Sequence, residues 1–183
     1  MKVLGLDLSL TATGAAIIED GVVGARWLIK TKADHTDMER YDYIVREIMA
    51  QVHEPTALLL GSDGAADLVA MEGVYGSRNI EVFRRLTALQ ACVQYALFRS
   101  RIQYVILPPA SWRTAIFGKG SKVDKERVRA AALSRLKAHT GDMDVEQVDL
   151  NVLEAFLVGL AAWKMEVGQV PKPVAKKRKK EAE

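Results

Sequence analysis

Residues 2–21, KVLGLDLSLTATGAAIIEDG, place one acidic residue, Asp7, inside a stretch that otherwise predicts buried β-structure. Apolar alternation and the turn signal Asp-Gly near the end of the stretch predict successive strands joined by short connections. Such strands pair antiparallel and form the beginning of one sheet. The predicted strands cover residues 2–9, 12–19 and about 22–31.

The rest of the chain alternates between helical and strand patterns. Two buried strands, one ending at Glu72 and one over residues 103–109, are separated by a long helical pattern and should therefore lie parallel. The sequence predicts an α/β fold with a central mixed five-stranded sheet, three antiparallel then two parallel strands, flanked by helices. Helices are expected at residues 36–53, 80–99, 124–138 and 150–165, with a short helical turn after Pro109.

The 183 residues carry 26 basic and 23 acidic side chains, distributed unevenly. Residues 171–183 hold six basic and two acidic residues, so residues 1–170 have a net charge of −1. Residues 111–137 form a second basic segment with a local charge of +6. Both segments suit a polyanionic partner, although a solvated helix face and a solubilising tail are the more general explanation. We expect one domain over residues 1–168 and a basic, disordered tail over residues 169–183.

Several classes of protein are excluded by composition. No stretch has the roughly 18 uncharged residues that a membrane span needs, and the N-terminus lacks the pattern of a secretory signal. The single cysteine, Cys92, allows neither an intramolecular disulfide nor a thiolate zinc site. We therefore expect no membrane partner and a cytoplasmic location.

Asp7 and Glu72 are the first two candidate functional residues. Asp7 is expected in the middle of the sheet, where an ionised carboxylate is costly unless it is paired, hydrogen-bonded or bound to a metal ion. A buried ion pair with an arginine is the structural alternative. Glu72 ends the strand that should return beside the first one, which would make the two carboxylates adjacent. A strand end that faces solvent is the alternative for Glu72.

The last predicted helix is apolar or glycine from Leu150 to Trp163 except for Asn151 and Glu154, three residues apart on one face. Asp149 precedes them, and an N-cap is a slightly better explanation for it than a metal ligand. Three separated carboxylates in apolar elements are best explained by a shared cation. Oxygen ligands alone favour Mg²⁺ or Mn²⁺, commonly two ions where a phosphodiester is hydrolysed.

In combination, four stretches resemble the RuvC family of Holliday junction resolvases, within the RNase H-like nuclease superfamily. The similarity extends over most of residues 1–163, and a phage-type member is one candidate. The resemblance thus implies the cytoplasm of a bacterial cell or of a phage-infected host. The first, second and final motifs of the family correspond to GLDLSLTATG, MEGVYGSRN and LNVLEAFLVGLAA, and its segment before the basic helix corresponds to PPASWRTAIFGKGSKVDKERV.

The resemblance implies an RNase H-like fold and a catalytic set of Asp7, Glu72, Asn151 and Glu154. Asp7, Glu72 and Glu154 correspond to ligands of Mg²⁺ or Mn²⁺. The family's final motif usually has Asp or His, two residues, then Asp, so Asn151 and Glu154 depart from it. A neutral Asn151 should weaken binding of a second ion unless Asp149 reaches the site, and these two residues are competing candidates for completing it.

Several residues are expected to contact DNA. Tyr75 corresponds to the family's aromatic residue beside a base at the branch point, although packing on the next helix is an equal alternative. Arg113 and Lys125 match basic positions of the family, and Lys119 lies between two glycines that would let the backbone approach a phosphate. The full expected set is Tyr75, Arg78, Asn79, Arg113, Lys119, Lys122, Lys125 and Arg129.

The function implied is that of a crossover junction endodeoxyribonuclease, which resolves four-way (Holliday) DNA junctions by paired symmetric nicks and leaves 5′-phosphates. Paired nicks need two sites related by a two-fold axis, so the resemblance also implies a homodimer, with the helix over residues 80–99 as the expected contact. The alternatives are an RNase H-like nuclease for other branched DNA or RNA-containing substrates, and a catalytically weak junction-binding protein. The chain is too short for the two lobes of an actin- or sugar-kinase-type nucleotide-binding protein.

Overall fold

The structure, a computed structural model, describes residues 1–53, 66–75, 79–119, 123–140 and 147–169. Five strands form one mixed sheet in the order β3-β2-β1-β4-β5. β1, β2 and β3 pair antiparallel, whereas β4 and β5 lie parallel to β1. The predicted five-stranded sheet is therefore confirmed. Its strands are β1 (Lys2–Asp7), β2 (Ala12–Glu19), β3 (Val22–Lys30), β4 (Leu68–Glu72) and β5 (Tyr104–Leu107).

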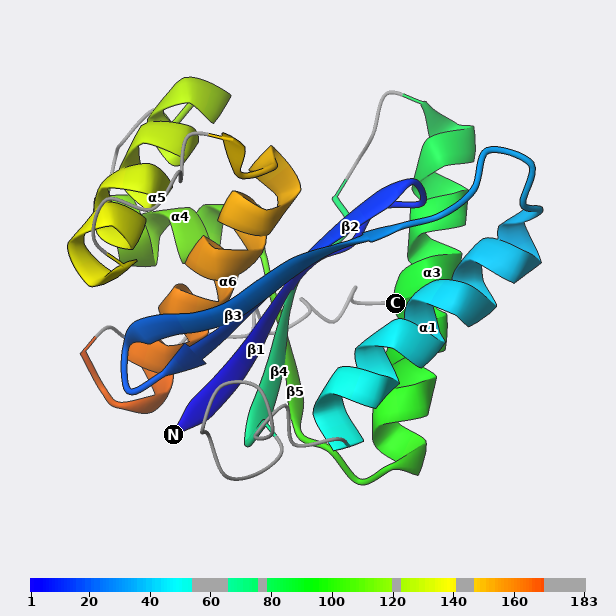
Figure 1. The fold of residues 1–183 in the computed structure, drawn as a ribbon, viewed down its shortest axis with the longest axis horizontal. Coiled ribbons are helices and arrows are strands. Elements are labelled where there is room, and N and C mark those ends of the chain that lie inside the picture. The colour runs from blue at the N-terminus through cyan, green and yellow to red at the C-terminus, as the bar shows by residue number, and fades with distance from the viewer. Residues whose placement is uncertain (54–65, 76–78, 120–122, 141–146, 170–183) are drawn as a thin grey trace, which may run out of the picture.

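Helices cover both faces of the sheet, α1 and α3 on one face and α4, α5 and α6 on the other (Figure 1). The segment after Pro109, predicted as a short helical turn, belongs to a nine-residue helix that begins at Pro109. A proline at its first position suits a helix start, and the buried Trp112 and Ile116 attach it to the core. The described helices are α1 (Asp37–His53), α3 (Ile80–Arg99), α4 (Pro109–Phe117), α5 (Lys125–Thr140) and α6 (Leu150–Glu166).

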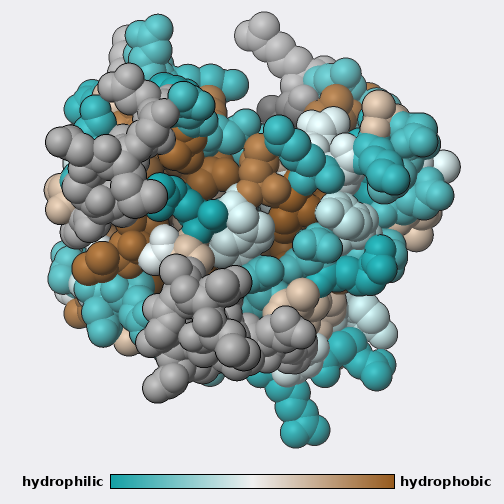
Figure 2. Space-filling model, in the orientation of Figure 1, coloured by the Kyte–Doolittle hydropathy of each residue, from teal (hydrophilic) through white to brown (hydrophobic). Residues whose placement is uncertain are grey.

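Alternating side chains of the strands divide the interior into two apolar cores. Leu4 and Leu6 of β1 pack with Met71 of β4 beneath α1 and α3. Val3 and Ala70 of the same strands face the opposite core beneath α6. In the view of Figure 2, hydrophilic side chains dominate the periphery and apolar side chains gather toward the centre. Alternate residues along each strand therefore pack against different sets of helices.

Glycines allow α6 to lie unusually close to the sheet. A Cβ atom on Gly5 would overlap the carbonyl oxygen of Ala155 and lie 2.7 Å from the nitrogen of Gly159. A Cβ atom on Gly14 would overlap the backbone carbonyl of Asn151. Because these are contacts with backbone atoms, larger residues would force the helix away from β1 and β2. The glycines therefore set the height of α6 above the strand ends.

The element boundaries follow local sequence signals. Asp20 and Gly21 have φ angles of 50° and 83°, as a tight turn between antiparallel strands requires. Thr36 and Glu39 form a reciprocal capping pair at the start of α1, with the Glu39 carboxylate accepting from the Thr36 backbone N–H at 2.7 Å. The side chain of Arg85 in α3 binds Asp37 through two nitrogens and joins α3 to α1.

Some predictions fall outside the described residues. Of the expected tail, residues 170–183 lie there, as does part of the loop around Lys119. Among the helices that the structure describes, none combines the length and the apolar character needed to cross a membrane.

Candidate functional site

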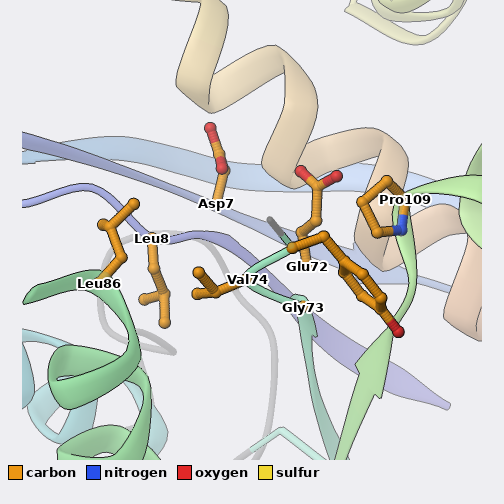
Figure 3. Close-up of a pocket in the computed structure, with 8 residues that line it drawn as sticks. Asp7, Leu8, Glu72, Gly73, Val74, Leu86 and Pro109 are labelled. Atoms are coloured by element: carbon orange, nitrogen blue, oxygen red, sulfur yellow. The ribbon is translucent and has the colours of Figure 1, made fainter. Parts of the chain in front are cut away.

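Two of the expected carboxylates end neighbouring parallel strands. Asp7 is the last residue of β1 and Glu72 the last residue of β4. The register pairs Leu6 with Met71, and one further step places Asp7 beside Glu72. Strand alternation directs both side chains to the face covered by α6, and Figure 3 shows the two carboxylates pointing to the same side. The sequence-predicted pair is thus brought together at the carboxyl edge of the parallel strands.

Glu154, in the first turns of α6, joins this pair. Burial raises the pKa of Asp7 well above its usual value, and the negative charges of Glu154 and Glu72 raise it further. Asp149 has a smaller effect in the same direction. Among the described residues, no basic side chain forms an ion pair with Asp7, so no described arginine supports the alternative of a buried Asp–Arg pair. The site has concentrated negative charge that the described protein groups do not balance.

The pKa of Glu72 is also raised, although its neighbours act on it in both directions. Burial raises the pKa of Glu72, the indole N–H of Trp112 lowers it, the charge of Glu154 raises it, and the charge of Arg113 lowers it. Trp112 is fully buried, and its Nε1 approaches Glu72 without forming a hydrogen bond of normal geometry among the described residues. Arg113 lies with its guanidinium carbon 5.1 Å from the centre of the Trp112 ring. α4 therefore supplies a donor and a positive charge beside the second carboxylate.

The first turn of α6 distinguishes the roles of Asp149 and Asn151. Asp149 is the N-cap, and its Oδ1 accepts a hydrogen bond from the Asn151 backbone N–H at 2.9 Å. The side-chain amide nitrogen of Asn151 donates to the carbonyl oxygen of Ala12 at 2.6 Å. A carbonyl oxygen only accepts hydrogen bonds, so the amide must turn its NH₂ group toward β2. Asn151 thus connects α6 to β2, a role that its position in the sequence does not reveal.

The donor set is suited to a hard divalent cation. Asp7, Glu72 and Glu154 offer only carboxylate oxygens, which Mg²⁺ and Mn²⁺ prefer. Within the described part of the chain, no three His, Cys, Asp or Glu side chains already lie close enough together to hold one metal ion. Burial and the neighbouring carboxylates raise the pKa of Asp7, and burial raises that of Glu72, so a cation bound there would compensate charge that is costly in this site.

The expected DNA contacts occupy two regions. Tyr75, 62% exposed, follows Glu72 after two residues, and its ring lies against Gly73. Asn79 caps α3, its Oδ1 accepting from the backbone N–H groups of Glu81 and Val82. Arg113, Lys119, Lys125 and Arg129 lie on α4, after it and on α5, where Lys119 and Lys125 are exposed. Arg78 and Lys122 lie outside the described residues.

Next to the two strand-end carboxylates lies an open cavity of about 220 Å³. Leu8 follows Asp7, Val74 lies two residues after the end of β4, and Leu86 comes from α3. Figure 3 shows these three side chains approaching one another. Sequence reasoning did not identify this cavity, because its members come from separate segments. One signal was present: Gln90, a polar residue on the apolar face of α3, holds one wall by accepting a hydrogen bond from the Val74 backbone N–H at 3.2 Å.

Comparison with known proteins gives similarity in structure only. No family model matches the sequence, and no curated protein matches it. The structure of Thermus thermophilus RuvC superposes with a TM-score of 0.70 at 19% identity, over 92% of this chain and 97% of that one. The same protein in complex with a Holliday junction substrate gives 0.69 at 16% identity, over 92% of this chain and 96% of that one.

The yeast mitochondrial Holliday junction resolvase Ydc2 is more distant, with a TM-score of 0.55 at 15% identity, over 91% of this chain and 80% of that one. At identities this low the similarity concerns the fold. The chain has the RNase H-like fold found in RuvC, with five strands in the order β3-β2-β1-β4-β5 and five described flanking helices.

Proposed function

We propose that this protein is a metal-dependent, structure-selective endonuclease that resolves four-way DNA junctions by paired symmetric nicks. The observation that carries the proposal is the position of Asp7 and Glu72 at the ends of neighbouring parallel strands of a RuvC-like fold, with Glu154 beside Asp7. One of the similar structures was determined with a Holliday junction substrate, which supports the choice of substrate. The products are 5′-phosphate and 3′-hydroxyl ends.

In this mechanism Asp7, Glu72 and Glu154 would hold Mg²⁺ or Mn²⁺. When bound, these cations would neutralise charge on the scissile phosphate and activate the attacking water. Glu72 is kept beside Arg113 and Trp112, so α4 orients one ligand while its arginine attracts a phosphate oxygen. Asn151, attached to Ala12, holds the start of α6 so that Glu154 remains beside Asp7.

Substrate positioning is proposed for the basic region and for the loop after β4. Lys119, Lys125 and Arg129 would contact backbone phosphates, which supply affinity but no sequence information. Tyr75 offers an exposed ring for stacking on an unpaired base. Arg78, Asn79 and Lys122 complete the proposed set, of which Asn79 already caps α3.

A homodimer is part of the proposal, because symmetric nicks need two sites. α3 exposes Ile80 by 75% and Phe98 by 70%, and Met38 of α1 is 70% exposed. Between α1 and α3 lies a second cavity, of about 260 Å³, lined mainly by apolar side chains that include Cys92 and Tyr95. A second copy of the chain would cover this surface.

The proposal is tested by a panel of labelled substrates offered with Mg²⁺ or Mn²⁺: a four-way junction, a flap, linear duplex and an RNA–DNA hybrid. We expect cleavage of the junction at two symmetric positions and intact duplex and hybrid. Glu154→Gln should retain junction binding and lose cleavage. Preferred cleavage of the hybrid or the flap would instead support a related nuclease with another substrate.

A second candidate, a junction-binding protein with little catalysis, is favoured by one observation. Asn151 stands where a fourth carboxylate could bind metal, and its amide nitrogen is used by the bond to Ala12. A site with three carboxylates would bind a second cation more weakly. Tight junction binding with no product at millimolar Mn²⁺ would support this second candidate.

A further inference from the structure

We propose that Arg40, on α1, is a positioning residue for the carboxylate centre on the opposite face of the sheet. It acts through the β1–β2 turn (residues 8–11), which directly follows Asp7 and is bonded to Arg40 at Leu10. This inference rests on the proposed function, since it concerns the same metal-binding carboxylates. It adds a residue of α1 to the groups that keep Asp7 and Glu154 in place.

Arg40 is a buried cation whose described hydrogen-bond partners are uncharged. It is the fourth residue of α1, and it is only 7% exposed. Within the part of the chain that the structure describes, no carboxylate forms an ion pair with it. Burial of a guanidinium group is costly unless its N–H groups are satisfied, so the fold depends on its hydrogen bonds. These bonds run from Nε to the carbonyl oxygen of His35 at 3.0 Å, from Nη2 to that of Ala33 at 2.9 Å, and from Nη1 to the carbonyl oxygen of Leu10 at 3.2 Å and to Oγ1 of Thr31 at 2.5 Å.

Two donors meet at the carbonyl oxygen of Leu10, within the β1–β2 turn. The Thr31 hydroxyl donates to this oxygen at 2.7 Å, and Arg40 Nη1 donates to it at 3.2 Å. Because Nη1 also donates to the Thr31 hydroxyl oxygen, the three groups form a closed triangle of hydrogen bonds. The Thr31 backbone N–H donates to the carbonyl oxygen of Thr11 at 3.1 Å. The β1–β2 turn is therefore attached both to α1 and to the segment that leads from β3 into α1.

The β1–β2 turn also has bonds and packing of its own. The fully buried hydroxyl of Thr13, in β2, donates to the carbonyl oxygen of Ser9 at 2.7 Å and accepts from the Ser9 backbone N–H at 3.0 Å. Leu8 and Leu10 are buried in the core beneath α1 and α3. Since closely packed groups transmit strain, a displacement of Leu10 would reach both ends of the turn.

The two ends of the β1–β2 turn belong to the carboxylate centre. Asp7 precedes the turn, and Ala12, which follows it, accepts the side-chain amide of Asn151 at 2.6 Å. Asn151 lies in the first turn of α6, which also carries Glu154. The contact at Leu10 thus sets the position of Asp7 relative to Glu154. Mg²⁺ demands nearly ideal octahedral geometry, so small shifts between its ligands weaken its binding.

The test measures Mn²⁺ binding by the full-length protein without DNA, through the electron paramagnetic resonance signal of the free ion. Arg40→Met retains an unbranched apolar side chain and removes every donor. We expect it to weaken Mn²⁺ binding about tenfold, the low end of the range for residues that support metal ligands. Half-maximal cleavage of a four-way junction should need more Mn²⁺ by the same factor. Junction affinity in EDTA should stay that of the wild type, because the proposed DNA contacts of α4 and α5 are unchanged.

Two further variants separate positioning from a general loss of stability. Val52→Ala is the matched control: Val52 is fully buried in the same core, twelve residues further along α1 and so about 18 Å from Arg40. It should lower the melting temperature and leave Mn²⁺ affinity unchanged. Thr31→Val removes the other donor to Leu10 with little change in shape, and it should weaken Mn²⁺ binding by a smaller factor than Arg40→Met. Thr31→Val decides the test if Arg40→Met does not fold.

Two outcomes would overturn the inference while the proposed function stands, provided that the wild type cuts junctions with metal. One is wild-type Mn²⁺ affinity in the folded variants of Arg40 and Thr31. The other is an equal loss of Mn²⁺ affinity in Val52→Ala, which would make the effect one of stability alone. If the wild type neither binds Mn²⁺ nor cuts junctions, the proposed function fails and this inference fails with it.

Discussion

Replacing Gly5 by alanine tests the link between the sheet and the catalytic carboxylates. The new Cβ would overlap the carbonyl oxygen of Ala155 and lie 2.7 Å from the nitrogen of Gly159, where ordinary contacts begin at 3.4 Å. Both neighbours are helix backbone, so relief requires movement of α6. Ala155 directly follows Glu154, so the same movement would take Glu154 away from Asp7.

The expected cost follows from these contacts. Overpacking of a closely packed core costs about 1–3 kcal/mol, and rigid backbone neighbours place Gly5→Ala toward the upper end. Alanine recovers about 0.5–1 kcal/mol by restricting the unfolded chain. The net loss is about 2 kcal/mol, which lowers the melting temperature of a domain of this size by about 4–8 °C.

Thermal and urea unfolding measure this loss, and Gly24→Ala is the matched control. Gly24 is also in the sheet, but its Cβ would meet no atom closer than 3.8 Å. We expect Gly24→Ala to be as stable as the wild type or slightly more stable. Equal stability of Gly5→Ala and Gly24→Ala would refute the claim that glycines set the height of α6.

Three further predictions concern charge and hydrogen bonding. Because burial and neighbouring carboxylates raise the pKa of folded Asp7, its ionisation destabilises the folded state as pH rises above the ordinary value of about 3.9. In EDTA, the melting temperature of Asp7→Asn should therefore exceed that of the wild type at pH 7, and the difference should disappear below about pH 4. A difference in melting temperature that does not depend on pH would contradict this cause. Asn151→Asp replaces the donor to Ala12 with a carboxylate and should cost about 1–3 kcal/mol in urea unfolding at pH 7, whereas unchanged stability would show that this bond contributes nothing. Deletion of residues 171–183, with their six basic residues, should weaken DNA binding and reduce the slope of log K against log salt by up to about 5; an identical slope would remove the tail from the DNA interface.

The sheet was predictable because its signals are local. Alternation in β1 and β2 and the Asp20–Gly21 turn predict antiparallel pairing, and the turn geometry agrees. The adjacency of Asp7 and Glu72 then follows from a general rule on connections between parallel strands. α4 was underestimated because nine residues give a weak periodic signal, and its helix depends on tertiary burial of Trp112 and Ile116.

The remainder of the site depends on packing that no sequence pattern displays. The sequence left both Asn151 and Asp149 as candidate ligands. Their bonds to Ala12 and to the helix N-terminus distinguish the contacts that they make in the structure. The approach of Glu154 to Asp7 depends on contacts of Gly5 and Gly14 with a helix far away in the sequence. Such contacts are decided by the assembled fold.

The central claim is that Asp7, Glu72 and Glu154 act together as a metal-dependent cutting centre. The most direct test is cleavage of a strand-labelled four-way junction by wild type and Asp7→Asn in Mn²⁺, Mg²⁺ or EDTA, with each cut mapped to the nucleotide. We predict two symmetric nicks by the wild type in either metal, none in EDTA and none by Asp7→Asn, which should still bind the junction. Cleavage that persists in Asp7→Asn or in EDTA would contradict the claim.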